Sequence, residues 1–183
     1  MICIGIDPGT CHCAFTVVES KSYLELQDDT FVEKTFADQF TVLESSTIPT
    51  VSTDKASIKE LTTTTVGHLD ELLKRYKSAI LAVEIQPFTG GSTGKRGYIT
   101  RQSLLNVSVE CCIVTFATTR NIQLKRIQAN SWQKHFNVTA KSKSFKYYTE
   151  NIPKMYFRCN TEQLANEHEF DGLLLAIYGF SSD

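Results

Sequence analysis

The sequence has no run of apolar residues long enough to cross a membrane. It also leaves no room for a leader peptide, because a strand-like apolar segment begins directly at Ile2. These two absences argue against secretion and organelle import, and they predict a cytoplasmic protein with no membrane contact. The 42% hydrophobic and 21% charged residues are typical of a globular chain, and the length of 183 residues predicts one domain over 1–183.

The six cysteines include no C-x-x-C pair, the spacing that is typical of zinc and redox sites. We therefore expect free thiols in a reducing compartment. The cluster Cys11-His12-Cys13 allows a zinc interpretation, but no matching second half exists elsewhere in the sequence.

Net charge is also small, at −1, which by itself argues against a partner as acidic as DNA. The distribution of the charged residues along the chain argues for such a partner instead. Residues 1–86 carry a net charge of −6 and residues 159–183 a net charge of −5, whereas residues 87–158 carry +10. A concentrated basic block is typical of a surface that binds phosphodiesters, although a solvated basic face with no ligand is the alternative.

Three acidic residues lie in three different contexts around this block. Asp7 ends the apolar segment 2–7, Glu84 ends the apolar segment 79–84, and Asp171 lies in an apolar C-terminal helix. Carboxylates at the ends of two buried strands that face a third on a packed helix suit divalent cations, which need oxygen ligands. The sequence therefore predicts a metal site.

Each of these residues also has a simpler interpretation. Asp7 precedes Pro8-Gly9 and could only form a turn, and Glu84 could be a strand-end charge. The segment Asp7-Pro8-Gly9-Thr10 is also similar to a phosphate loop of actin-like ATPases and sugar kinases. Those proteins need a second such lobe and a longer chain, and no second Asp-x-Gly-Thr is present, so the metal site is favoured.

Hydrophobic periodicity predicts strands alternating with helices. We expect a hairpin over 2–7 and 13–19, a third strand within 21–40, and a Ser- and Thr-rich loop over 42–54. Beyond these, the predicted elements are helix 55–76, strand 79–84, a flexible Gly-rich loop over 89–97, helix 101–118, strand 121–127, a short helix near 130–136, and helices 141–156 and 161–180.

The sequences of the three acidic segments resemble motifs of RuvC-type Holliday junction resolvases. Ile4-Gly5-Ile6-Asp7-Pro8-Gly9-Thr10 is similar to their first motif, and Glu84-Ile85-Gln86 is similar to the Glu-x-Gln of their poxvirus-type and mitochondrial branch. His168-Glu169-Phe170-Asp171, followed by an apolar helix, resembles their closing motif. The resemblance implies an α/β RNase H-like fold: a mixed five-stranded sheet with antiparallel first three strands and helices on both faces.

The same resemblance implies a function. It predicts a structure-specific endodeoxyribonuclease that resolves four-way DNA junctions by paired phosphodiester hydrolysis, with two Mg²⁺ ions per site and Mn²⁺ able to substitute. It also implies a homodimer, with helices 55–76 and 101–118 as candidate surfaces, and a viral or phage origin. The alternatives are another RNase H-fold nuclease that acts on branched DNA or RNA, and a non-catalytic DNA-binding protein of the same fold.

The resemblance assigns roles residue by residue. The expected metal ligands are Asp7, Glu84, His168 and Asp171. Lys143 is the expected catalytic lysine, but Lys141 and Lys146 lie in the same lysine-bearing segment, and the sequence does not decide which of the three approaches the scissile phosphate. The expected DNA contacts are Phe88, Lys95, Arg96, Arg101, Lys141, Lys143 and Lys146.

The assignments of His168 and Phe88 leave alternatives open. Glu167 or Glu169 could replace His168 as a ligand, and His168 could be a surface histidine. Phe88 could cap the core instead of stacking on a base. Trp132 is expected in the core rather than at a ligand.

Overall fold

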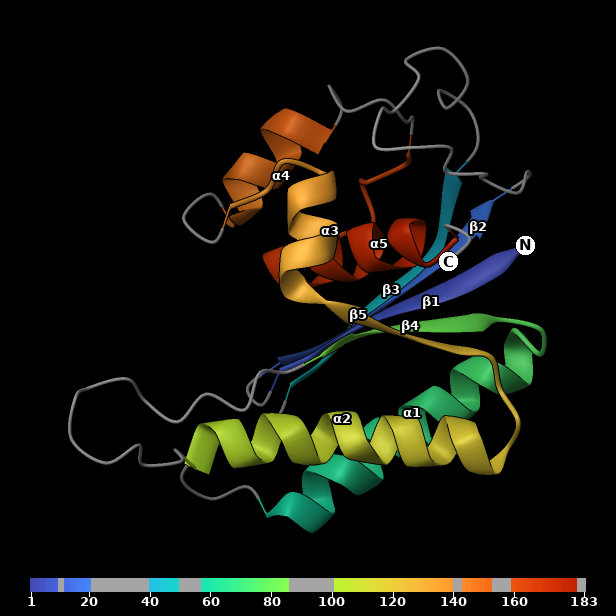
Figure 1. Ribbon diagram of the computed structural model, residues 1–183. Helices are drawn as coiled ribbons and strands as arrows, with labels where there is room; N and C mark the ends of the chain where they lie inside the picture. Colours follow the sequence, from blue (N-terminus) through green and yellow to red (C-terminus); the bar gives the residue numbers. More distant parts are fainter. Residues whose placement is uncertain are drawn as a thin grey trace, which may run out of the picture.

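The computed structural model describes residues 1–9, 12–20, 40–49, 57–85, 101–139, 143–152 and 159–180. These residues form a five-stranded sheet with helices on both faces (Figure 1). The strand order is β3-β2-β1-β4-β5. The strands are β1 (Ile2–Pro8), β2 (His12–Ser20), β3 (Phe40–Pro49), β4 (Ile80–Ile85) and β5 (Leu124–Gln128).

Strand pairing confirms the predicted fold class. β1 is antiparallel to β2, and β2 is antiparallel to β3. β4 lies parallel to β1 on its other side, and β5 lies parallel to β4. The buried central strands β1 and β4 are short apolar runs, as expected where helices cover both faces of a sheet.

The prediction of a loop over 42–54 was wrong for the residues that the structure describes. The Ser- and Thr-rich segment that we expected to be a loop forms β3, while residues 21–39 lie outside the described part of the chain. The hydroxyl groups of β3 are bound by distant side chains: Ser45 and Thr47 donate to Glu169, and Ser46 contacts His68. These partners satisfy the hydrogen-bonding groups of the strand. By composition alone, the same Ser- and Thr-rich segment is typical of a loop.

The helices divide between the two faces of the sheet (Figure 1). One face carries α1 (Ile58–Arg75) and α2 (Arg101–Thr119). The other carries α3 (Ala129–His135), α4 (Phe145–Asn151) and α5 (Glu167–Gly179). Each face has its own cluster of buried apolar side chains. Within the described residues, no helix has the length and apolar character needed to cross a membrane.

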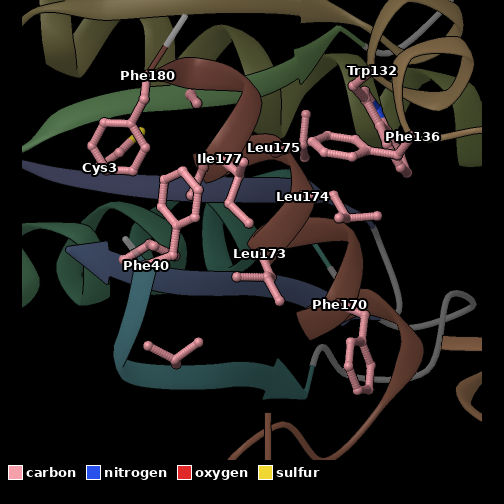
Figure 2. Packing of buried hydrophobic residues seen from close by; sticks show 14 of the residues in the cluster. Cys3, Phe40, Trp132, Phe136, Phe170, Leu173, Leu174, Leu175, Ile177 and Phe180 are labelled. Carbon is pink, nitrogen blue, oxygen red and sulfur yellow. The ribbon is translucent and has the colours of Figure 1, made fainter. Parts of the chain in front are cut away.

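Helix α5 lies directly on the centre of the sheet. Figure 2 shows its apolar side chains beside Cys3 and Phe40 from the strands and beside Trp132 and Phe136. The helix approaches β1 backbone to backbone, because a Cβ atom on Gly5 would lie 1.8 Å from the carbonyl oxygen of Gly172. This contact fixes the residue before Gly172, which is Asp171, above the carboxyl end of β1.

Candidate active site

Two carboxylates meet at one edge of the sheet. Asp7 and Glu84 are each the next-to-last residue of their strands, and the parallel register pairs the preceding residues, Ile6 and Val83. Parallel neighbours end at the same edge, so the two side chains are neighbours there. Each residue is only 8% exposed, although both carry a carboxylate.

The first turns of α5 bring two more groups to this edge. Asn166 caps the helix by accepting the backbone N–H groups of His168 and Glu169, which is the usual way to satisfy a helix N-terminus. The Nδ1 atom of His168 then lies 2.9 Å from Oδ2 of Asp7, and the His12 ring stacks against the His168 ring. Asp171, one turn further along, is also buried.

Side chains from α3, α4 and the segment before α4 hold these carboxylates. Lys143 Nζ donates to Asp171 Oδ2 at 2.7 Å, and the Tyr148 hydroxyl donates to Asp171 Oδ1. The indole N–H of Trp132 donates to Glu84 Oε2 at 2.7 Å. Lys143 Nζ also lies 4.5 Å from the centre of the Trp132 ring, a cation–π distance.

Burial and mutual repulsion perturb the acids. Burial, together with the nearby charges of Asp7 and Asp171, raises the pKa of Glu84 to about 7, against the opposing effects of Lys143 and Trp132. Burial also raises the pKa of Asp171 to about 6, although Lys143 and Tyr148 favour its ionised form. The hydrogen bond to Asp7 raises the pKa of His168. The site therefore holds more buried negative charge than Lys143 neutralises.

That excess of negative charge fits a divalent cation. Carboxylate oxygens with one imidazole are a donor set for Mg²⁺ or Mn²⁺, and a bound cation would favour the ionised carboxylates against the burial and repulsion that raise their pKa values. In the described part of the chain, no three acidic, histidine or cysteine side chains already converge as a preassembled metal cluster. Protein donors occupy the carboxylates instead: Lys143 and Tyr148 on Asp171, and Trp132 on Glu84.

A scan against protein-family models and a search of curated protein sequences find no match. The structure of T. thermophilus RuvC in complex with a Holliday junction substrate matches at a TM-score of 0.63 and 16% sequence identity, covering 97% of this chain and 91% of that one. The chain has a RuvC-like RNase H fold.

Two further solved structures agree. Another Thermus thermophilus RuvC structure gives a TM-score of 0.62 at 15% identity, with 97% of this chain and 92% of that chain covered. The yeast mitochondrial Holliday junction resolvase Ydc2 gives 0.56 at 13% identity, with 97% and 76% covered. At these identities the likeness concerns the fold.

Within the RuvC-like fold, the two glutamates that flank His168 have different surroundings. Glu169 is buried and faces β3, where its carboxylate accepts hydrogen bonds from Ser45, Thr47, Asn166 and the backbone of Ala165. Glu167 is exposed. Among the three neighbouring candidates, His168 is therefore the one whose side chain contacts Asp7.

The predicted DNA contacts are only partly described. Lys143 lies in the carboxylate cluster, while Lys146 on α4 has an 85% exposed side chain, 3.9 Å from Glu150. Arg101 begins α2, but its side chain lies outside the described part. The predictions for Phe88, Lys95, Arg96 and Lys141 fall on residues outside the described part as well.

Sequence reasoning missed two residues of the site. Tyr148 was not singled out, because one tyrosine in a basic helix carries no spacing signal. Trp132 was expected in the core, and it is indeed fully buried, but its N–H also donates to Glu84. A buried Trp usually needs a partner for its N–H, which is the signal that could have suggested a polar neighbour.

Proposed function

We propose that this chain is a metal-dependent endodeoxyribonuclease that cuts four-way DNA junctions. One observation carries the proposal: buried Asp7 and Glu84 end adjacent parallel strands of a RuvC-like fold, and buried Asp171 lies on the helix that packs over them. The likeness to RuvC bound to a junction substrate supports the choice of branched DNA.

The metal ligands in this proposal are Asp7, Glu84, His168 and Asp171. Two Mg²⁺ ions, when bound, supply a water that is nucleophilic at neutral pH and stabilise charge on the phosphate oxygens. The imidazole of His168 favours a softer ion than an all-carboxylate set does, so Mn²⁺ should also support the reaction. Burial of the carboxylates excludes water and strengthens their attraction for the cations.

Lys143 is the residue proposed to meet the scissile phosphate. Its ammonium already lies among the carboxylates, bound to Asp171 and above the Trp132 ring. With Asp171 holding a cation, Lys143 would be free to offer its ammonium to a phosphate oxygen as a further positive charge. Tyr148 keeps a hydrogen bond on Asp171 in either case and so holds that carboxylate in place.

The DNA would lie along the basic part of the chain, residues 87–158. Lys146, one turn beyond Lys143 and highly exposed, is proposed to bind backbone phosphate. On sequence grounds, we propose that Phe88 stacks on a base. We propose on the same grounds that phosphates are bound by Lys95, Arg96, Arg101 and Lys141.

The experiment that tests the function uses a synthetic four-way junction, with a linear duplex of the same sequence as control. We expect Mg²⁺-dependent cleavage of the junction only, and loss of cleavage with retained junction binding in Asp7→Asn, Glu84→Gln and Asp171→Asn. Cleavage by Asp7→Asn would contradict the metal site. Binding without cleavage by the wild type would favour the non-catalytic alternative, and cleavage of RNA hybrids would favour a different nuclease.

A further inference from the structure

The single tryptophan of the chain contacts both sides of the acidic cluster. Trp132 lies on the short helix α3 and is 0% exposed. Its N–H reaches Glu84 on β4 at 2.7 Å, and its ring face carries the Lys143 ammonium at 4.5 Å from the ring centre. Lys143 in turn reaches Asp171 on α5 at 2.7 Å.

These contacts form one chain of interactions from β4 to α5. The indole N–H is a single donor with one direction, so it restricts how the Glu84 carboxylate can rotate. The ring face is the negative part of the indole quadrupole, and it attracts the Lys143 ammonium and so helps to fix its position. A rigid side chain thus orients two groups that the proposed reaction uses.

Packing alone does not require this arrangement. The apolar cluster around α5 already contains Phe136 and Phe170, which fill space without a polar atom. A phenylalanine at position 132 could fill most of the same volume, but it has no N–H for Glu84. A buried carboxylate that lost this donor would lose part of its compensation.

We propose that Trp132 is a positioning residue of the metal site, in which the indole N–H holds Glu84 for metal binding and the ring face seats Lys143. This inference rests on the proposed metal-dependent function. Groups that hold metal ligands in this way typically change metal affinity or activity by about 10–100-fold when they are replaced.

The test compares Mg²⁺ binding by calorimetry for the full-length wild type, Trp132→Phe and Phe136→Leu. Phe136 is the matched control, because it is a buried aromatic residue just beyond the same helix. We expect Trp132→Phe to weaken Mg²⁺ affinity about 10–100-fold and Phe136→Leu to leave it unchanged, at similar losses of melting temperature. Equal Mg²⁺ affinity in wild type and Trp132→Phe would overturn the proposal.

A second measurement does not depend on whether Trp132→Phe folds. Trp132 is the only tryptophan, so the fluorescence of the wild type reports on its surroundings. We expect Mg²⁺ to change this emission in the wild type and not in Glu84→Gln, where the ligand that connects the metal to the indole has lost its charge. An equal Mg²⁺ response in Glu84→Gln would overturn the proposal.

The two proposals fail in different ways. A wild type that binds no Mg²⁺ and cuts no junction would overturn the nuclease function and this inference together. A wild type that binds Mg²⁺ and cuts junctions, beside a Trp132→Phe protein with unchanged Mg²⁺ affinity and unchanged cleavage, would overturn only the role of Trp132.

Discussion

At the level of single side chains, His168 and its acidic neighbour Glu169 differ in what they contact. His168 lies against Asp7, whereas the carboxylate of Glu169 is engaged by β3 and by the turn before α5. If His168 binds metal, His168→Asp should retain cleavage and shift the preference from Mn²⁺ toward Mg²⁺. His168→Ala should lose most cleavage at low metal concentration and recover part of it at high concentration.

The control for this prediction is Glu169→Gln. We expect that change to lower the melting temperature, because it weakens the hydrogen bonds that join α5 to β3, while the metal preference stays as in the wild type. Cleavage measured against Mg²⁺ and Mn²⁺ concentration separates the two effects. A nearly silent His168→Ala beside a Glu169→Gln protein with altered metal dependence would contradict the assignment.

The raised pKa of Glu84 predicts how the stability of the metal-free protein depends on pH. Its folded-state pKa of about 7 lies above its ordinary value of 4.5, so the folded state binds this proton more tightly than the unfolded state does. The stabilising contribution is complete below the ordinary pKa and is lost as pH rises through about 7. Asp171, with a pKa of about 6, acts in the same direction.

Glu84→Gln should remove the loss of folding stability that ionisation of Glu84 causes at high pH. We expect the variant to be more stable than the wild type at pH 8 in the presence of a chelator, by about 1–3 kcal/mol, and to differ less at pH 5. Urea unfolding at the two pH values measures this. Addition of Mg²⁺ at pH 8 should stabilise the wild type more than the variant, and a variant less stable than the wild type at pH 8 would contradict the prediction.

At the level of elements, the contact between α5 and β1 decides where Asp171 lies. Both partners are glycine at the point of closest approach, and a Cβ on Gly5 would meet the backbone of Gly172 at 1.8 Å and of Ala176 at 2.7 Å. Gly5→Ala should therefore force the helix away from the strand and destabilise the fold by about 3 kcal/mol or more. Chemical unfolding measures this loss.

Gly67→Ala is the matched control for Gly5→Ala. It lies in α1, and an added Cβ there would have no atom within 4 Å. We expect it to stabilise the protein by about 0.5–1 kcal/mol, because alanine is the better helix former. If both changes had similar effects, the close contact between α5 and β1 would not be the reason for glycine at position 5.

For the whole molecule, the two-fold symmetry of a four-way junction favours a homodimer that presents two active sites. Helix α2 exposes two residues that such a contact could bury: Leu104 is 44% exposed, and Cys111 is exposed two turns further along. Helix α1, the other candidate, exposes Ile58 at 50%. We propose that α2 forms the dimer contact.

Sedimentation of Leu104→Glu and Ile58→Glu tests this choice. We expect Leu104→Glu to shift the protein toward a monomer, because a buried unpaired charge at an interface is costly, and to reduce paired cleavage more than metal binding. Ile58→Glu should leave the dimer intact. The reverse result would assign the contact to α1, and two dimeric variants would exclude both positions from it.

The sequence by itself determined the order and type of most elements and the positions of the acidic residues. Apolar runs marked β1 and β4, and helical periodicity marked α1 and α2, because these patterns depend on residues that are neighbours along the chain. The strand-end positions of Asp7 and Glu84 followed from the same runs. That Asp171 lies on a helix followed from the apolar segment after it.

Only the tertiary structure decided which of these residues touch. The Ser- and Thr-rich segment becomes β3 by pairing with β2, and Glu169, more than 100 residues further on, accepts hydrogen bonds from two of its hydroxyl groups. His168 contacts Asp7 instead. Trp132 donates to Glu84 across 48 residues, and Lys143 reaches Asp171 across 28. The spacing of apolar residues along a chain shows whether a segment is a helix or a strand. The partner of a buried polar group depends instead on which elements pack together. That packing is fixed only when the sheet and its helices assemble.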